Sequence, residues 1–233
     1  MSILVPNGCI DLVSNADGQK ACDAIQRQVA LDFAPKWLQS DVIHYIGDSQ
    51  TEKPQSGDRI VRIVKLSSDA GTLGSHWLDG AVPTGEVGVQ TCKDDNVKWQ
   101  SCLSHEILEM IGDPLATLCY QVGNLIWAGE VSDRVEDSDP TYIIDDVPVE
   151  NFSLPSAFLE GSSGPWDFRG KCSSNIVLPN GYQLQVELGS GQWTQVTGAL
   201  ARKSKRVASE TSRRAARMRR AGVKPSSLIV VPA

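Results

Sequence analysis

The residues best suited to metal chemistry lie in the stretch 103-LSHEILEMIGDP-114. It contains His105, one of three histidines in the chain, followed directly by Glu106 and, four positions after the histidine, by Glu109. Residues i and i+4 of a helix share one face, so His105 and Glu109 can direct their side chains at one cation. Glu106 is turned about 100° away, where a carboxylate can act as a general base. The spacing predicts a metal site on a helix.

A catalytic metal site needs a third protein ligand besides the helix pair. We expect Glu130, in 129-GEVSD-133, to supply it. Asp133 lies three residues further on and is expected to hold a ligand in position by hydrogen bonding. Asp113, just after the helix, is the alternative to Glu130 and otherwise a further supporting carboxylate.

A second histidine, His76 in 74-GSHW-77, lies just ahead of a presumed edge strand. There it could face the site as a catalytic donor that stabilises an oxyanion, or as a ligand. The structural alternative is a loop histidine stacked beside Trp77. His44 lies inside an apolar run and is expected to be structural.

The order of these segments is similar to that of the zincin metallopeptidases, and the Glu130 spacing resembles the gluzincin branch, whose third ligand is a glutamate. Several stretches resemble more closely an uncharacterised zincin-like, HExxE-variant family found in bacteria and their phages. They are 28-QVALDFAPKW-37, 74-GSHWLDGAVPTGEVGV-89, 103-LSHEILEMIGDP-114, 129-GEVSDRVED-137 and 151-NFSLPSAF-158. The resemblance implies a metallopeptidase-like hydrolase with a bound divalent metal.

Glu109 departs from the peptidase pattern, which has histidine at this position. A His-Glu-Glu set carries two negative charges, which favours harder cations and makes bound water less acidic than histidine ligation does. Zinc, which the resemblance implies, is the first expectation, and Mn²⁺ and Ca²⁺ are the alternatives that this donor set favours. In the resembling family the glutamate is part of the pattern.

The elements around these residues predict an α+β fold with a mixed twisted sheet and an active-site helix. A helix of about 14 residues is expected from residue 19, closed by Pro35. A second helix over 97–111 would end with Gly112 in the left-handed conformation. Period and composition predict strands at 9–14, 41–46, 59–66 and 86–92, and a hairpin of 116–122 with 125–133.

The composition argues against a secreted protein and against a membrane-spanning one. The opening MSILVPNGCIDLVSN lacks the basic start and long apolar run of a signal peptide, and no apolar run is long enough to span a membrane. The six cysteines form no CxxC pair, so we expect mostly buried thiols in a reducing compartment. We predict a cytoplasmic or virion location and no membrane partner.

Charge divides the chain into an expected zincin-like domain, residues 1–198, and a basic tail, residues 199–233. The tail carries ten Lys and Arg against one acidic residue, whereas the first 198 residues carry 12 basic and 27 acidic residues, a net charge of −15. A helix over 202–222 could bind nucleic acid through residues 202–224 or pair with the acidic domain in a homo-oligomer or viral particle. The apolar end 228–233 could add as a strand to another chain.

Two functions follow from these patterns. The first is a metal-dependent, peptidase-like hydrolase acting on a peptide or protein, with metal ligands His105, Glu109 and Glu130 and with Glu106 as general base. The alternative is a phage virion structural or assembly protein that keeps the zincin-like scaffold and uses its tail and terminal strand for contacts.

Overall fold

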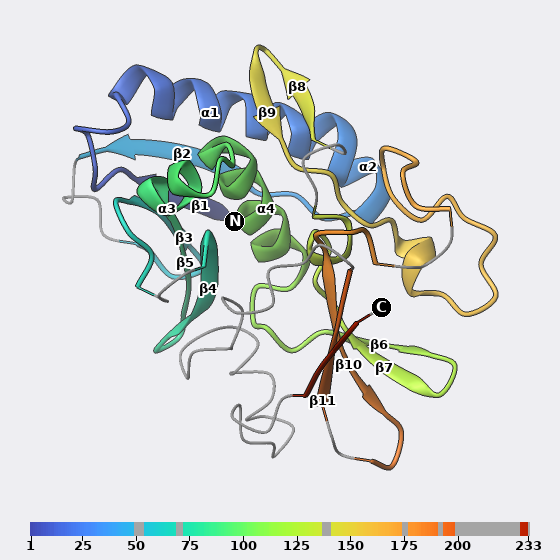
Figure 1. Cartoon of the computed structure of the whole chain (residues 1–233). Coiled ribbons are helices and arrows are strands. Elements are labelled where there is room, and N and C mark those ends of the chain that lie inside the picture. The colour runs from blue at the N-terminus through green and yellow to red at the C-terminus, as the bar shows by residue number, and fades with distance from the viewer. Residues whose placement is uncertain are drawn as a thin grey trace.

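The computed structural model describes residues 1–48, 54–68, 72–136, 141–173, 177–190, 193–198 and, as backbone alone, 229–232. Figure 1 shows an α+β arrangement in which β1 to β5 gather on one side and β6, β7, β10 and β11 on the other. The expected α+β class with a mixed twisted sheet is confirmed.

The first sheet has the strand order β2-β1-β3-β5-β4. Neighbours run parallel except at the edge, where β4 is antiparallel to β5. The strands are β1 (Ser2–Pro6), β2 (Val42–Gly47), β3 (Arg59–Val64), β4 (Gly74–Asp79) and β5 (Val82–Gly88). Because β4 is the last strand in this order, residues 74–79 form an edge strand that contains His76 rather than following it.

The helices begin and end differently from the sequence-based expectation. They are α1 (Asn15–Gln28), a π-helical turn (Val29–Phe33), α2 (Ala34–Trp37), α3 (Val89–Asp94) and α4 (Trp99–Gly112). Ser14 caps α1 by accepting a hydrogen bond from the Asp17 amide, so the helix starts earlier than predicted. Pro35, which was expected to close the helix, has no N–H to donate, but it comes just after the π-helical turn and the chain remains helical through it. The helix ends where Leu38 adopts a left-handed φ of 55°.

Three local predictions were wrong. Residues 9–14 form turns instead of a strand, because the Asn7 side chain binds both the Cys9 amide and the Val13 carbonyl. Residues 89–92 belong to α3, and β5 ends at Gly88. Gly112 is the last residue of α4 and not a left-handed cap. A Cβ on Gly112 would lie 3.1 Å from a methyl group of Val131, so close packing accounts for this glycine.

The second sheet has the order β12-β11-β10-β7-β6. Its strands are β6 (Cys119–Val122), β7 (Leu125–Ala128), β10 (Tyr182–Glu187), β11 (Trp193–Thr197) and β12 (Ile229–Pro232). The predicted hairpin is confirmed as β6 and β7. A separate hairpin joins β8 (Tyr142–Ile144) to β9 (Val147–Val149), and short 3₁₀ turns cover Asp133–Val135 and Pro155–Phe158.

The basic tail helix predicted over 202–222 lies outside the described residues. The terminal segment does form a strand, but β12 pairs in parallel with β11 of its own chain. Contacts to another chain through this segment would therefore use the outer edge of β12 or an exchange of the strand. All six cysteines are free thiols, and five of them are buried, as expected.

None of the helices in the described ranges combines the length and the apolar character that a bilayer crossing requires.

Two buried polar contacts fix helix α4 against its neighbours. The Arg59 side chain on β3 donates 2.8 Å to the Met110 carbonyl in the last turn of α4 and forms a 2.6 Å ion pair with Asp41. On the other side, Ser104 donates 2.6 Å to Gln28 of α1. These contacts hold α4 beside both the sheet and α1.

Arg59→Met tests the first contact. It leaves the carboxylate of Asp41, which is 4% exposed, without its guanidinium partner. Loss of one partner of a buried ion pair typically costs about 3–5 kcal/mol. Because the chain's N-terminal ammonium lies 3.5 Å from the other oxygen of Asp41, we expect the lower end of this range. The measurement is urea unfolding, with the partly exposed Arg62→Met on the same strand as the control; equal effects of the two substitutions would contradict the interpretation.

Candidate metal centre

Helix α4 supplies three polar side chains to one buried region. His105 lies at the middle of this helix and Glu106 and Glu109 in its second half, and both carboxylates are almost fully buried. The rest of the helix is also mostly buried, and it packs on β5, β4 and β3 of the first sheet. The carboxylates therefore lie between the helix and other protein layers instead of facing solvent, where acidic side chains usually lie.

Strand β4 delivers His76 to this region, and two glycines make the approach close. Gly85 is the partner of His76 across the β4–β5 ladder, and a Cβ there would lie 3.1 Å from the His76 Cβ. Gly74 is two residues before His76 and therefore on the same face of the strand. A Cβ on Gly74 would lie 2.6 Å from Oε1 of Glu106. Glycine at these positions leaves the space that His76 and Glu106 occupy.

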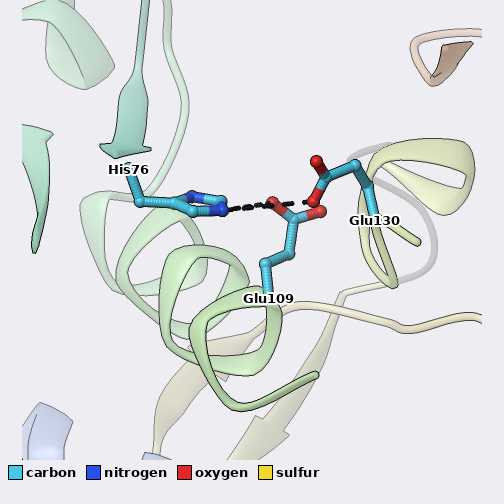
Figure 2. Close-up of side chains that lie close together, drawn as sticks. All are labelled: His76, Glu109 and Glu130. Carbon is cyan, nitrogen blue, oxygen red and sulfur yellow. Dashed lines mark ion pairs between the residues drawn. The ribbon is translucent and has the colours of Figure 1, made fainter. Parts of the chain in front are cut away.

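Glu106 orients the His76 ring. One carboxylate oxygen of Glu106 forms a short hydrogen bond with Nδ1 of His76. A carboxylate on one ring nitrogen fixes the tautomer and leaves the other nitrogen as an acceptor, which is the arrangement commonly found behind metal-bound histidines. In His76 the other nitrogen, Nε2, points toward Glu109 and Glu130 (Figure 2).

His76, Glu109 and Glu130 form the first group that could hold a cation. Nε2 of His76 lies 3.8 Å from Oε2 of Glu109 and 4.0 Å from Oε2 of Glu130. Both separations are too long for a hydrogen bond. Two ligand atoms about 2.1 Å from one ion are about 3.4 Å apart at the tetrahedral angle and about 4.2 Å apart when they lie on opposite sides of the ion. Nε2 of His76, seen in Figure 2, is thus close enough to each carboxylate to share an ion with it, and the three donor atoms all lie within 4.8 Å of one another.

His105, Glu109 and Asp133 form a second group beside the first. Nε2 of His105 lies 3.4 Å from Oε1 of Glu109 and 3.3 Å from Oδ1 of Asp133. Glu109 belongs to both groups. The i, i+4 pairing of His105 and Glu109 that the sequence predicted is therefore present, but Glu109 also meets His76.

The loop after β7 brings Glu130 and Asp133 to α4. The backbone amides of Ser132 and Asp133 each donate to Oε1 of Glu109 at 3.3 Å. Val131 packs against Gly112, and its carbonyl accepts a 2.6 Å hydrogen bond from the Ser153 amide. Backbone hydrogen bonds and the packing of Val131 thus hold the loop in place, and its amides orient the Glu109 carboxylate.

The electrostatic environment favours the charged form of His105. Burial by itself lowers the pKa of His105, but the negative charge of Glu109, the hydrogen bonds to Asp133 and Glu109 and the charge of Glu106 outweigh it. As a result the pKa of His105 is raised well above its usual value. Without a bound cation, a proton on His105 partly balances the carboxylates around it.

The structure divides the predicted site residues into a cluster of six and Asp113, which lies outside it. The structure brings together His76, His105, Glu106, Glu109, Glu130 and Asp133. We expected His105 to join Glu109 and Glu130 as a metal ligand. In the structure it is His76 that lies near both of these glutamates, while His105 is paired with Asp133. Asp113 belongs to neither group: its carboxylate accepts hydrogen bonds from the Thr117 and Leu118 amides and so shapes the turn after α4.

Sequence reasoning missed Gly74 and Gly85. Both lie in the glycine-rich stretch around His76, and glycine in a strand marks close approach of other groups. The donor set of one imidazole and two carboxylates in each group fits a divalent cation.

No family model, curated protein or solved structure gives a significant match to this chain.

Gly74→Ala should disturb the site without altering a candidate ligand. The new methyl group would press on Glu106, which should release Nδ1 of His76 and weaken Zn²⁺ binding about 10- to 100-fold, the range seen when partners of metal ligands are lost. The measurement is competitive titration against a chelating dye. Gly8→Ala is the control, because a Cβ there meets nothing nearer than 3.5 Å. Unchanged affinity in a folded Gly74→Ala protein would show that Glu106 does not orient a ligand.

Proposed function

We propose that this protein is a metal-dependent hydrolase of zincin type that acts on peptide bonds. His76, Glu109 and Glu130 would hold the metal ion, with zinc as the first candidate and Mn²⁺ next. A divalent cation bound there would act as a Lewis acid on the carbonyl group of a substrate. The proposal includes membership of the zincin-like family that the sequence resembles.

The observation that carries the proposal is the convergence of His76, Glu109 and Glu130 from three separate elements. Their donor atoms lie within 4.8 Å of one another, and all three side chains are buried. Buried carboxylates in such proximity repel each other, so a cation among them would offset a cost that folding otherwise bears. This arrangement of buried carboxylates and an imidazole is therefore better explained by metal binding than by a role in packing the core.

Glu106 has a different role in this proposal from the one its sequence position suggested. Its hydrogen bond to Nδ1 of His76 makes it a positioning residue. By fixing the ring it keeps the lone pair of Nε2 directed at the metal position.

The edge strand supports a peptide as the substrate. Strand β4 pairs with β5 on one side only within the described sheet. An extended peptide could add to the other side through backbone hydrogen bonds, as peptides do at other exposed sheet edges. Since His76 belongs to this strand, a peptide bound along it would pass beside the metal ligands.

The experiment combines zinc binding with hydrolysis. The purified full chain, loaded with Zn²⁺ or Mn²⁺, should cleave an unfolded protein substrate such as reduced casein. His76→Gln and Glu130→Gln should each lower zinc affinity at least about tenfold and reduce cleavage to background, because each removes one ligand of three.

His44→Gln is the matched control, because His44 is an exposed histidine on β2, away from the cluster. It should retain both metal binding and cleavage. Full metal loading of the wild type without cleavage of any peptide or protein would refute the hydrolase and leave a metal-binding protein. Absence of metal after Zn²⁺ and Mn²⁺ are supplied would refute both.

A further inference from the structure

Glu109 faces two histidines with different oxygens. Its Oε2 is the atom nearest Nε2 of His76, at 3.8 Å, and its Oε1 is the atom nearest Nε2 of His105, at 3.4 Å. A carboxylate that presents one oxygen to each of two neighbouring donor groups has the geometry of a bridging ligand. In two-metal sites the ions lie about 3.5–4 Å apart, a distance that a carboxylate can span.

The two donor groups are alike in composition. Each combines one imidazole nitrogen with the shared Glu109 and one further carboxylate, Glu130 in the first group and Asp133 in the second. In the second group, Nε2 of His105 lies 3.3 Å from Asp133 and 3.4 Å from Glu109. These separations agree with about 3.4 Å between tetrahedral ligands of one small cation. The second group is therefore also spaced closely enough to share a cation, and the same separations are those of the hydrogen bonds that His105 makes to Asp133 and Glu109.

Formal charge also favours two cations. The cluster contains Glu106, Glu109, Glu130 and Asp133, each no more than 6% exposed. With both imidazoles neutral these carboxylates carry a charge of −4. One divalent cation would leave −2 in a buried region, or −1 with a proton on His105, whereas two cations would bring the cluster to neutrality. Neutralisation matters here because uncompensated buried charge is among the most costly features a fold can contain.

We infer that the protein binds two divalent cations, one at His76, Glu109 and Glu130 and the other at His105, Glu109 and Asp133, with Glu109 as the bridge. This inference deepens the proposed function and rests on it, because the first cation position is the same. It adds a second position and gives Asp133 and His105 the role of ligands.

The competing arrangement holds one cation and a proton. In it His105 stays an imidazolium that pairs with Glu109 and Asp133, and only the first group binds metal. The two arrangements differ in the number of ions bound and in whether those ions interact magnetically. Both quantities can be measured without any assay of activity.

The experiment is equilibrium dialysis of the full chain against Mn²⁺, followed by metal analysis and electron paramagnetic resonance. For the wild type we expect about two equivalents of Mn²⁺ and a broadened spectrum from coupled ions. For Asp133→Asn and His105→Gln we expect one equivalent and the hyperfine-resolved spectrum of an isolated ion. His44→Gln should match the wild type.

Each outcome decides the question. One equivalent and an uncoupled spectrum in both the wild type and Asp133→Asn would overturn the second position and leave the single-metal proposal intact. No bound Mn²⁺ or Zn²⁺ in the wild type would overturn both. Circular dichroism and thermal unfolding identify variants that fail to fold, and in that case the wild-type count and spectrum are sufficient, since they require no substitution.

Discussion

Burial of like charges is the constraint on which this structure depends. Glu106, Glu109, Glu130 and Asp133 lie together away from solvent, although acidic side chains are rarely fully buried unless they are paired. Two imidazoles offset part of this charge, through the hydrogen bond of His76 to Glu106 and the contacts of His105. Backbone amides of Ser132 and Asp133 add further compensation at Glu109. A bound cation would offset the free energy of burying these like charges, whereas without one the fold has to bear it.

The rest of the fold keeps the three contributing elements in place. Arg59 and Gln28 tether α4 at its end and along its length, and the close contact of Gly112 with Val131 brings the loop that carries Glu130 against the helix. On the opposite side, Gly74 and Gly85 let β4 approach without displacing Glu106 or His76. The contacts that position the site are therefore nonlocal, and they combine hydrogen bonds to α4 with close packing at glycines.

Local patterns explain why part of this organisation could be predicted from sequence. The helix that carries His105 and Glu109, the β6–β7 hairpin and the strands over 42–47 and 59–64 all follow from periodicity and turn residues. The partner of each histidine could not be predicted in the same way. The i, i+4 rule places His105 beside Glu109, but it says nothing about a strand 30 residues earlier whose His76 binds Glu106. Likewise, the glycine at 112 has a familiar role at helix ends, yet here its reason is a side chain from a distant loop.

The glutamate at position 109 acquires a physical meaning from this geometry. A histidine at this position would offer one ring nitrogen to a metal and hold a hydrogen atom or a supporting partner on the other. A carboxylate has two equivalent oxygens separated by a single carbon atom, so it can serve two donor groups at once. In this chain its oxygens do face two different histidines. A glutamate at position 109 is thus a residue that could serve two ions where a histidine could serve one, and its carboxylate charge is part of what a second cation would balance.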